Sequence, residues 1–440
     1  MSTKNMDASL LTILLFASLI CILFLSVPIA FGIGIVSLTF GYFIWGPASI
    51  FILASQVYAG MQNPSLVSLP FFMFMAAILV RSGIADDLYD AMYLLIGKFR
   101  GGLAIGTIFV CAGIGCMSGV SAVGVLTSTK IALPAMLRRN YDEKISLGVI
   151  MSGGALGQLF PPSVLAIVYG GLSGVSVGKM FAVGLSTGIA LVFCLVTYVF
   201  IRCWLNKELC PAAEDDPRQE ISLQTRIQIY SRTLPSILIV LAVLGSMLAG
   251  IATPTEAAAI GAAASALIAL ILRAINGKDI FNAAVDAAKQ TTMVLWIALN
   301  SLLFVSVYSG IGGGDVVNDL IVNLSISPGL VTAAMLVIVF VLGFFIDPIG
   351  ILFLTMPVFL PVLLALDVNL IWFGALTILV LETAYLTPPF GYNIFFLKAA
   401  APASISLLTI YSATPAFVLI QLLTVAVCFA MPEIVLWITE

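Results

Sequence analysis

Four short segments of this chain combine Gly, Pro, Ser and Thr within otherwise apolar stretches. They are residues 118–121, 153–163, 343–350 and 382–393. A helix that breaks inside a membrane leaves backbone groups unpaired, and this is tolerated only where the break is buried in protein or lines a wet cavity. The freed carbonyls and nearby hydroxyls are oxygen ligands suited to a small cation, and the N-terminal ends of half-helices present amide groups to an anion. These segments are therefore the candidate binding sites.

One internal repeat relates the four segments to each other. Residues 80–103 and 307–330 share Val, Ser-Gly-Ile and a closing Gly-Leu at a constant offset of 227 residues, which also carries the Pro-Pro pair at 161–162 onto the one at 388–389. Gly and Pro are common in membrane helices for packing reasons, so a single break is more often a kink at a helix interface. Breaks that are paired by one offset favour a binding function over a packing one.

The composition is that of a polytopic helical membrane protein. Of the 440 residues, 61% are hydrophobic and only 9% are charged, with a mean hydropathy of +1.18, and soluble domains do not have this balance. The net charge of −3 and the dispersed basic residues predict no nucleic-acid partner. The chain has no His, so it lacks the commonest proton shuttle and the commonest transition-metal ligand.

The cysteines form no CxxC pair and lie mostly in predicted membrane spans. We therefore expect them to be small apolar packing residues and not a disulfide framework or a metal site. They are Cys21, Cys111, Cys116, Cys194, Cys203, Cys210 and Cys428.

The apolar runs predict an all-α fold of transmembrane helices, because runs of about 20 apolar residues cross the hydrocarbon core. Two longer stretches, 103–137 and 327–366, are interrupted midway at 118–121 and 347–350, which predicts two re-entrant helical hairpins. Residues 84–98 and 278–290 mix polar and apolar positions and are expected to form amphipathic helices along the interface. The remaining spans are expected at about 10–27, 29–45, 64–80, 146–170, 180–202, 234–251, 256–273, 291–310, 370–396 and 406–431.

The basic residues predict that the two copies of the repeat have opposite orientations. Arg100 precedes the first hairpin and Arg138 and Arg139 follow it, whereas residues 307–370 contain no Lys or Arg. Basic residues favour the cytoplasmic side, so the first hairpin starts and ends there and the second starts and ends outside. An inverted repeat with helix breaks in corresponding positions is the architecture of a secondary transporter that binds its substrate near the bilayer midplane.

The same rule predicts the path of the whole chain. If both termini are periplasmic, every Lys and Arg of the 18 lies on the cytoplasmic side except Lys4, Lys130 and Lys179. The longest polar segment, 206–232, is then a cytoplasmic linker between the halves.

The stretches SGVSAVGVLTS, LPAMLRRNYD, GGALGQLFPPSVLAIVYG, FFIDPIGILFLTMPVFLPV and LTPPFGYNIFF resemble the large membrane subunit of tripartite ATP-independent periplasmic (TRAP) transporters. The resemblance covers essentially the whole chain. It implies a sodium-driven elevator in a bacterial inner membrane that takes up a small organic anion, such as a carboxylate or sulfonate. It also implies two partners, a small membrane (Q) subunit and a periplasmic substrate-binding (P) protein.

The resemblance further implies how the chain divides into a transport domain and a scaffold. Scaffold helices are expected at 1–83 and 171–310, and the transport domain is expected at 84–170 and 311–398. A C-terminal helix is expected at 399–440.

Two sodium sites follow from the same resemblance, the second by motif position and the first through the repeat offset. The first site is expected to use Ser118, Ser121, Gly157, Phe160 and Ser163. The second is expected to use Gly343, Ala384, Thr387 and Phe390. Candidate substrate residues are Ser121, Lys130, Asp347, Glu382 and Asn393.

Glu382 and Lys130 are ionisable groups at membrane depth, where a charge costs at least ~2.5 kcal/mol and a partner or a function is expected. We hypothesise that the two residues pair or jointly shape the anion site. The alternative is a neutral Glu382 and a Lys130 whose side chain extends to the membrane surface.

Two other functions are compatible with parts of the sequence. A stand-alone sodium/carboxylate carrier has a similar architecture without a binding protein. An intramembrane aspartyl protease would use a GxGD motif, here 312–315, with Tyr89-Asp90. The inverted repeat argues against the protease, since it places the two carboxylates on opposite sides of the bilayer.

Overall fold

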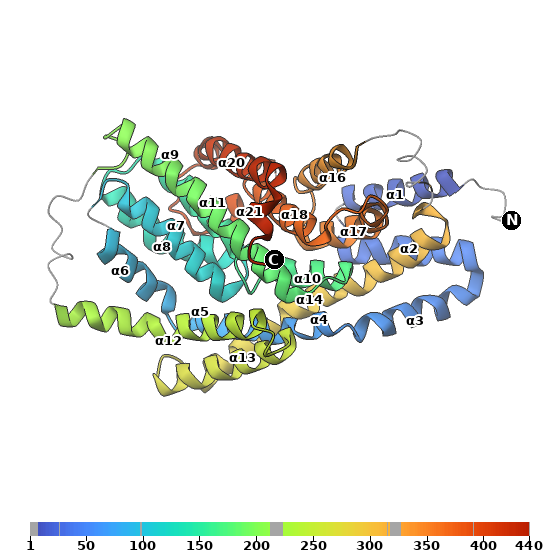
Figure 1. Cartoon of the computed structure of the whole chain (residues 1–440), viewed down its shortest axis with the longest axis horizontal. Helices are drawn as coiled ribbons and strands as arrows, with labels where there is room; N and C mark the ends of the chain where they lie inside the picture. Colours follow the sequence, from blue (N-terminus) through green and yellow to red (C-terminus); the bar gives the residue numbers. More distant parts are fainter. Residues whose placement is uncertain are drawn as a thin grey trace.

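The computed structural model describes residues 8–25, 27–96, 99–211, 223–314, 316, 327–389 and 391–439, and every regular element in these ranges is helical (Figure 1). Among them, 8 helices are long and apolar enough to cross a membrane. The prediction of an all-α multi-span fold is confirmed.

In the first half of the chain, the described residues form eleven α-helices. Short 3-10 turns connect α2 to α3 and follow α9. The α-helices are α1 (Ala8–Phe24), α2 (Ile29–Trp45), α3 (Ser49–Met61), α4 (Pro64–Val67), α5 (Leu69–Arg81), α6 (Ile84–Ile96), α7 (Gly102–Ser118), α8 (Ser121–Arg138), α9 (Glu143–Ala155), α10 (Val164–Ser173) and α11 (Val177–Leu205).

The second half repeats this order. Its described helices are α12 (Leu223–Leu248), α13 (Pro254–Ile271), α14 (Gly277–Gly310), α16 (Pro328–Leu342), α17 (Pro348–Ala365), α18 (Leu370–Ala384), α19 (Tyr392–Ala400), α20 (Leu407–Ala430) and α21 (Pro432–Leu436).

The offset of 227 residues found in the sequence extends through most of the structure. It carries α7 to α11 onto α16 to α20 within a few residues at each end, and the first residue of α8, Ser121, onto that of α17, Pro348. It also carries α2 onto α13, and the stretch of α3 to α5 onto the single helix α14. The repeat is therefore a repeat of the fold and not only of a few motifs.

The helices pack as two groups. The first, which we call the scaffold group, joins α1–α5 with α12–α14, and α14 lies against α2, α3 and α5. The second, which we call the hairpin group, joins α7–α11 with α16–α21. In Figure 1 the hairpin α7–α8 lies at one end of this group and α16–α17 at the other, with the broken helices between them.

Both predicted hairpins are present as two helices joined by a short turn. The α7–α8 turn is possible because Gly119 adopts a positive φ of 63°, and a Cβ atom there would collide with the carbonyl oxygen of Pro162. The α16–α17 turn ends at Asp347, whose carboxylate accepts a hydrogen bond from the Gly350 amide at 2.9 Å and so caps α17. The interruptions seen in the sequence thus mark where each hairpin turns.

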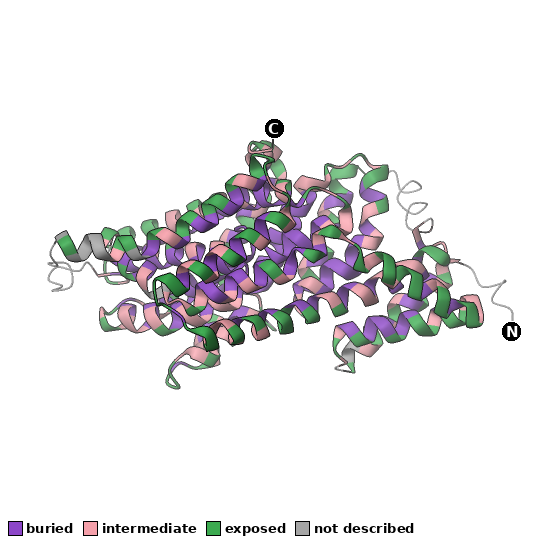
Figure 2. Cartoon of the chain, turned by 90° about the horizontal axis from the view of Figure 1, so that it is seen from below, coloured by how far each residue is buried: buried purple, intermediate pink, exposed green. Residues whose placement is uncertain are grey.

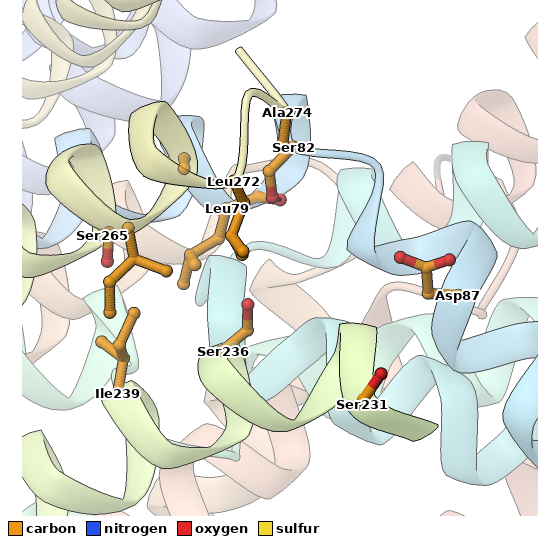
Figure 3. Close-up of a pocket in the computed structure, with 11 residues that line it drawn as sticks. Leu79, Ser82, Asp87, Ser231, Ser236, Ile239, Ser265, Leu272 and Ala274 are labelled. Atoms are coloured by element: carbon orange, nitrogen blue, oxygen red, sulfur yellow. Dashed lines mark hydrogen bonds between the residues drawn. The ribbon is translucent and has the colours of Figure 1, made fainter. Parts of the chain in front are cut away.

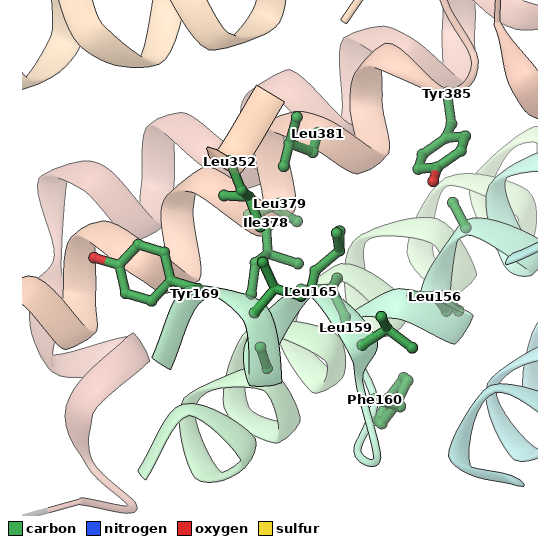
Figure 4. Packing of buried hydrophobic residues seen from close by; sticks show 14 of the residues in the cluster. Leu156, Leu159, Phe160, Leu165, Tyr169, Leu352, Ile378, Leu379, Leu381 and Tyr385 are labelled. Carbon is green, nitrogen blue, oxygen red and sulfur yellow. The ribbon is translucent and has the colours of Figure 1, made fainter. Parts of the chain in front are cut away.

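Both predicted broken helices are also present. α9 ends at Ala155 and α10 starts at Val164, and α18 ends at Ala384 and α19 starts at Tyr392. Each hairpin packs against the broken helix of its own repeat and against the second half-helix of the other, since α8 contacts α9 and α19, and α17 contacts α10 and α18. The core beside these breaks is apolar and continuous between the repeats (Figure 4).

Buried residues concentrate where the helices face each other, and exposed residues lie on the outward faces (Figure 2). Many of the exposed residues are large and apolar. Phe51 is 80% exposed and Leu408 is 77% exposed. In a soluble protein such exposure is costly, but lipid is as apolar as these side chains. The pattern agrees with a multi-span membrane protein.

Several expectations about elements are corrected. Helix α3 was not predicted, because its 13 residues are too few for an independent span. Residues 278–290 are not a separate interface helix but the first turns of the 34-residue α14, which has no Gly or Pro between its end residues. Helix α12 begins inside the predicted linker, whose residues 212–222 lie outside the described part of the chain.

Two further corrections concern packing. Helix α11 packs with the hairpin group, because it contacts α7, α9, α10, α18 and α20, although it lies within the stretch 171–310 that was expected to form scaffold helices. Cys203 and Cys210 form a disulfide with a Cα–Cα distance of 5.4 Å, whereas no disulfide was expected. The two cysteines are seven positions apart: Cys203 lies in the last turn of α11, and the segment after the helix brings Cys210 to it.

Candidate substrate and cation sites

A cavity of about 320 Å³ lies where the hairpin group meets the scaffold group. The hairpin group contributes both hairpin turns, through Ser121 and Asp347, and both helix breaks, through Gln158 and Tyr385. The scaffold group contributes Met73 and side chains of α14 around residue 290. All four sequence-predicted segments therefore reach one cavity.

Four helices begin at this cavity, namely α8, α10, α17 and α19, since the first residue of each lines it. Unpaired amide groups give a helix N-terminus a partial positive charge, which favours an anion. No Lys or Arg is present among the described residues that line the cavity, and Asp347 is the only carboxylate among them. An anion bound here would be held by helix ends, neutral donors and any co-bound cations.

The first predicted sodium site is assembled by contact between the α7–α8 turn and the break after α9. A Cβ atom on Gly157 would lie 3.2 Å from the Val120 carbonyl oxygen, and Gly119 lies against Pro162 and Ser163. Ser118, Ser121 and Ser163 are all buried in this contact. Phe160, also buried, follows Gly157 by less than one helical turn.

The second predicted site is assembled in the same way. A Cβ atom on Gly343 would collide with the Ala384 side chain, so the α16–α17 turn touches the end of α18. Thr387 lies three residues further along, in the break itself. Phe390, the fourth predicted residue, lies outside the described residues.

The candidate hydroxyl groups each direct their hydrogen to a protein acceptor. Ser121 Oγ donates to Asn393 Oδ1 at 2.6 Å, Thr387 Oγ1 donates to the Thr383 carbonyl at 2.8 Å, and Ser163 Oγ donates to the Gln158 carbonyl. Because a hydroxyl has two lone pairs, each oxygen keeps acceptor capacity after it donates. These oxygens therefore have the chemistry of cation ligands.

Asn393 is fully buried and links the two repeats. Its Nδ2 donates to the Met151 carbonyl at 2.8 Å, which orients its Oδ1 toward Ser121. Asn393 is not among the residues that line the cavity. Both ends of its amide are occupied by protein groups, so it holds the first hairpin turn against α9 and α19, where a substrate contact had been expected.

Glu382 and Lys130 lie in different environments. Glu382 is 0% exposed and faces the backbone amides of Gln158 and Leu159 without reaching the geometry of a hydrogen bond, whereas Lys130 is exposed on α8. The hypothesis that they pair does not hold in this structure, and neither lines the cavity. Lys130 lies on an outward face of α8. This agrees with the alternative, in which its side chain extends to the membrane surface. Of the five predicted substrate residues, Ser121 and Asp347 do line the cavity.

Four polar residues of the cavity were not among the predicted site residues, namely Gln158, Gln290, Tyr385 and Tyr392. Two of them, Gln158 and Tyr385, contact each other. Gln158 Nε2 donates to Tyr385 Oη at 2.7 Å. The signal that identifies them is the repeat itself, because the two positions are separated by the offset of 227 residues.

A larger cavity, of about 420 Å³, lies away from the helix breaks (Figure 3). Its walls come from α5, α6, α12 and α13 and include Ser82, Asp87, Ser236 and Ser265. It contains none of the hairpin turns or breaks, and it has no counterpart of the converging helix N-termini.

The fold is that of a multi-span helical membrane protein. Two solved structures share the fold, each with a TM-score of 0.66 at 12% identity. The Alcanivorax borkumensis YdaH transporter aligns over 88% of this chain and 89% of its own. Neisseria gonorrhoeae MtrF aligns over 98% of this chain and 96% of its own.

Residues 16–434 match the family model of the tripartite ATP-independent periplasmic transporter, DctM component. The chain belongs to this family, the large permease component of TRAP transporters. It is a transporter permease and not an enzyme, which excludes the aspartyl protease alternative. Asp315, which that alternative required, lies outside the described residues.

Relatives in this family have different substrates in their names. The chain is 30% identical to the C4-dicarboxylate TRAP transporter large permease protein DctM of Pseudomonas aeruginosa, over 89% of this chain and 91% of that protein. It is 27% identical to the ectoine permease TeaC of Halomonas elongata, over 98% and 99%. It is 25% identical to the isethionate TRAP transporter permease protein DctMQ of Oleidesulfovibrio alaskensis, over 90% of this chain and 61% of that protein.

Proposed function

We propose that this protein drives the sodium-coupled uptake of a small organic anion across a bacterial inner membrane, with both of its termini in the periplasm. The observation that carries the proposal is the meeting of four helix N-termini and both hairpin turns at a cavity whose described lining has no Lys or Arg. Helix N-termini attract the anion, and sodium ions at the two serine- and threonine-containing breaks supply the remaining positive charge.

Two sodium ions would occupy the predicted sites. Ser118, Ser121, Ser163 and Thr387 would supply hydroxyl oxygens, and the backbone at Gly157, Gly343 and Ala384 would supply carbonyls. Hard cations prefer such oxygen ligands. A cation at each break would neutralise carbonyl dipoles that the broken helix leaves unpaired, so binding of sodium would order the hairpin turns.

The movement we propose is of the elevator type, with the hairpin group sliding along the scaffold group as an inverted-repeat domain. Support comes from the position of the cavity, whose walls are divided between the two groups. A substrate held between them changes sides when one group shifts, while its contacts within the hairpin group persist.

The partners would be a small membrane (Q) subunit and a periplasmic substrate-binding (P) protein. The name DctMQ of the isethionate relative supports the first, since that protein is longer than this chain and combines the M and Q designations. The substrate class would be a carboxylate or sulfonate, as the relatives' names indicate.

The test is reconstitution of the chain with its small membrane subunit and binding protein in liposomes. Uptake of radiolabelled succinate, ectoine, isethionate and N-acetylneuraminate is measured with an inward sodium gradient and with an equal potassium gradient. We expect sodium-dependent accumulation of one of these compounds, and only with the binding protein present. Uptake without the binding protein would favour the stand-alone carrier, and no uptake of any probe would contradict the proposal.

A further inference from the structure

Gln158 and Tyr385 lie at the symmetry axis of the fold. They occupy equivalent positions in the two repeats, because the same offset of 227 residues separates them and the two proline pairs. Equivalent residues of two copies can contact each other only where the axis that relates the copies passes between them. The hydrogen bond of 2.7 Å from Gln158 Nε2 to Tyr385 Oη therefore marks this axis, and both residues line the cavity there.

The pair has hydrogen-bonding capacity that the protein does not use. Gln158 is 7% exposed, and its Oε1 has no hydrogen-bond partner among the described residues. An amide has two N–H donors and one acceptor, and a phenol has one donor and one acceptor. One hydrogen bond between the two groups leaves at least one donor unused, whichever way the amide is turned. Leaving such buried groups unpaired is unfavourable, so a ligand is expected to complete them.

The rings and backbone around the pair hold it in place. The Tyr385 ring packs edge-on against the Tyr392 ring, with centroids 5.5 Å apart. The backbone N–H of Asn393 donates a hydrogen bond to the backbone carbonyl of Tyr385 at 3.1 Å. Gln158 ends the 3-10 turn that follows α9. Each side chain thus comes from a break in a membrane helix, and neither position is set by a flexible loop at the surface.

We propose that Gln158 and Tyr385 form a neutral donor site that binds the anionic head group of the substrate and helps to select it. The inference rests on the proposed function. The site is on the axis, so it lies midway between the two hairpin turns, where an anion attracted by the surrounding helix N-termini would settle. Neutral donors are sufficient there because the helix ends and the bound sodium ions supply the positive charge.

The experiment uses the reconstituted complex described above, with the probe that the parent protein accumulates. Tyr385→Phe removes the hydroxyl and keeps the ring that packs on Tyr392. Gln158→Met removes the amide at similar length. We expect each change to lower kcat/KM for the loaded binding protein about tenfold or more, the loss of one hydrogen bond to a charged group. The sodium concentration for half-maximal uptake should stay unchanged, and the double variant should be no worse than the poorer single one.

Tyr169→Phe is the matched control. Tyr169 is a fully buried tyrosine on α10 whose hydroxyl donates to the Leu370 carbonyl at 2.6 Å, and it does not line the cavity. The kcat/KM of the Tyr169→Phe variant should stay within twofold of that of the parent. If the parent is active and both Tyr385→Phe and Gln158→Met keep kcat/KM within twofold of it, this inference is overturned and the proposed function stands. A parent that accumulates none of the four probes would overturn the proposed function and this inference with it.

Discussion

At the scale of single residues, the polar groups of the site differ in whether their hydrogen-bonding capacity is already used by other protein groups. Ser121 and Thr387 each donate their hydrogen to a neighbouring oxygen and keep lone pairs for a cation. Asn393 has both ends of its amide occupied and is a structural link. Gln158 and Tyr385 have donors or acceptors left over. This difference separates candidate ligand residues from residues that hold the site together.

The first prediction concerns the hydroxyl oxygens of Ser121 and Thr387. We expect Ser121→Ala and Thr387→Val each to raise the sodium concentration for half-maximal uptake about tenfold, because each removes one ligand oxygen worth roughly 1.4 kcal/mol. The measurement is sodium-dependent uptake in liposomes.

Ser152→Ala and Thr377→Val are matched controls for these two variants. Ser152 lies on α9 and Thr377 on α18. Both residues are buried and bond their own i−4 carbonyls, and neither belongs to a predicted sodium site. Their sodium dependence should equal that of the parent. The assignment fails if the test variants respond to sodium in the same way as the controls.

At the scale of elements, the two hairpins define where the cavity opens. A smaller cavity of about 210 Å³ lies beside the α7–α8 turn, and Met73, Val120 and Gln290 line both this cavity and the central one. Arg81 of α5 and Asp286 of α14, which form an ion pair, also line this smaller cavity. The two cavities are therefore neighbours, and the smaller one lies between the first hairpin and the scaffold group on the side of Arg81.

The second prediction tests whether the hairpin group moves along the scaffold group. In a cysteine-free background, Met73→Cys on α5 and Val120→Cys in the first hairpin turn place one thiol on each group. We expect a short bifunctional thiol reagent to stop uptake and expect reduction of a cleavable linker to restore it, because the cross-link fixes the two groups together.

Two controls separate arrest of the movement from simple obstruction. Phe31→Cys with Trp296→Cys joins α2 to α14 within the scaffold group, where the parent rings are 5.9 Å apart, and this cross-link should leave uptake intact. Each single-cysteine variant treated with the same reagent should also stay active. If the Met73–Val120 cross-link leaves uptake at the level of these controls, the elevator mechanism is not supported.

At the scale of the whole molecule, the repeat extends through nearly all described helices, but its two copies differ in how they build the scaffold. The first copy uses α3, α4 and α5, with Asn63 capping α4 and Pro64 as its first residue, and the second uses the unbroken α14. A single helix of 34 residues contacts α2, α3 and α5 together. The scaffold thus has a rigid element that runs past the cavity.

The third prediction concerns the orientation of the chain. The distribution of Lys and Arg predicts periplasmic termini and a cytoplasmic linker. Single cysteines at Ser2 and Gln219, both outside the described residues, should therefore differ when intact cells receive a membrane-impermeant maleimide. The cysteine at Ser2 should be labelled at once, and the one at Gln219 only after permeabilisation. Labelling of Gln219 alone in intact cells would reverse the proposed topology.

The sequence by itself determined the class of fold, the two hairpins and the two broken helices. These features depend on local chemistry: hydropathy sets the spans, and Gly119 and the two proline pairs interrupt helices wherever they stand. The repeat offset related the breaks to each other, so their approach at one cavity was already expected. The motifs at these breaks also indicated the family of TRAP large permeases, and the match to the family model confirms that the chain belongs to it.

Only the tertiary structure decided which side chains meet. Lys130 and Glu382 share a membrane depth in the sequence prediction, but packing turns Lys130 outward and encloses Glu382 behind the first break. Asn393 reaches Ser121 across 272 residues, and Gln158 reaches Tyr385 across 227. Helix periodicity gives the face of one helix, but a contact between the repeats depends on how two groups of helices pack. That packing is set by the summed contacts of the whole core and by no single motif.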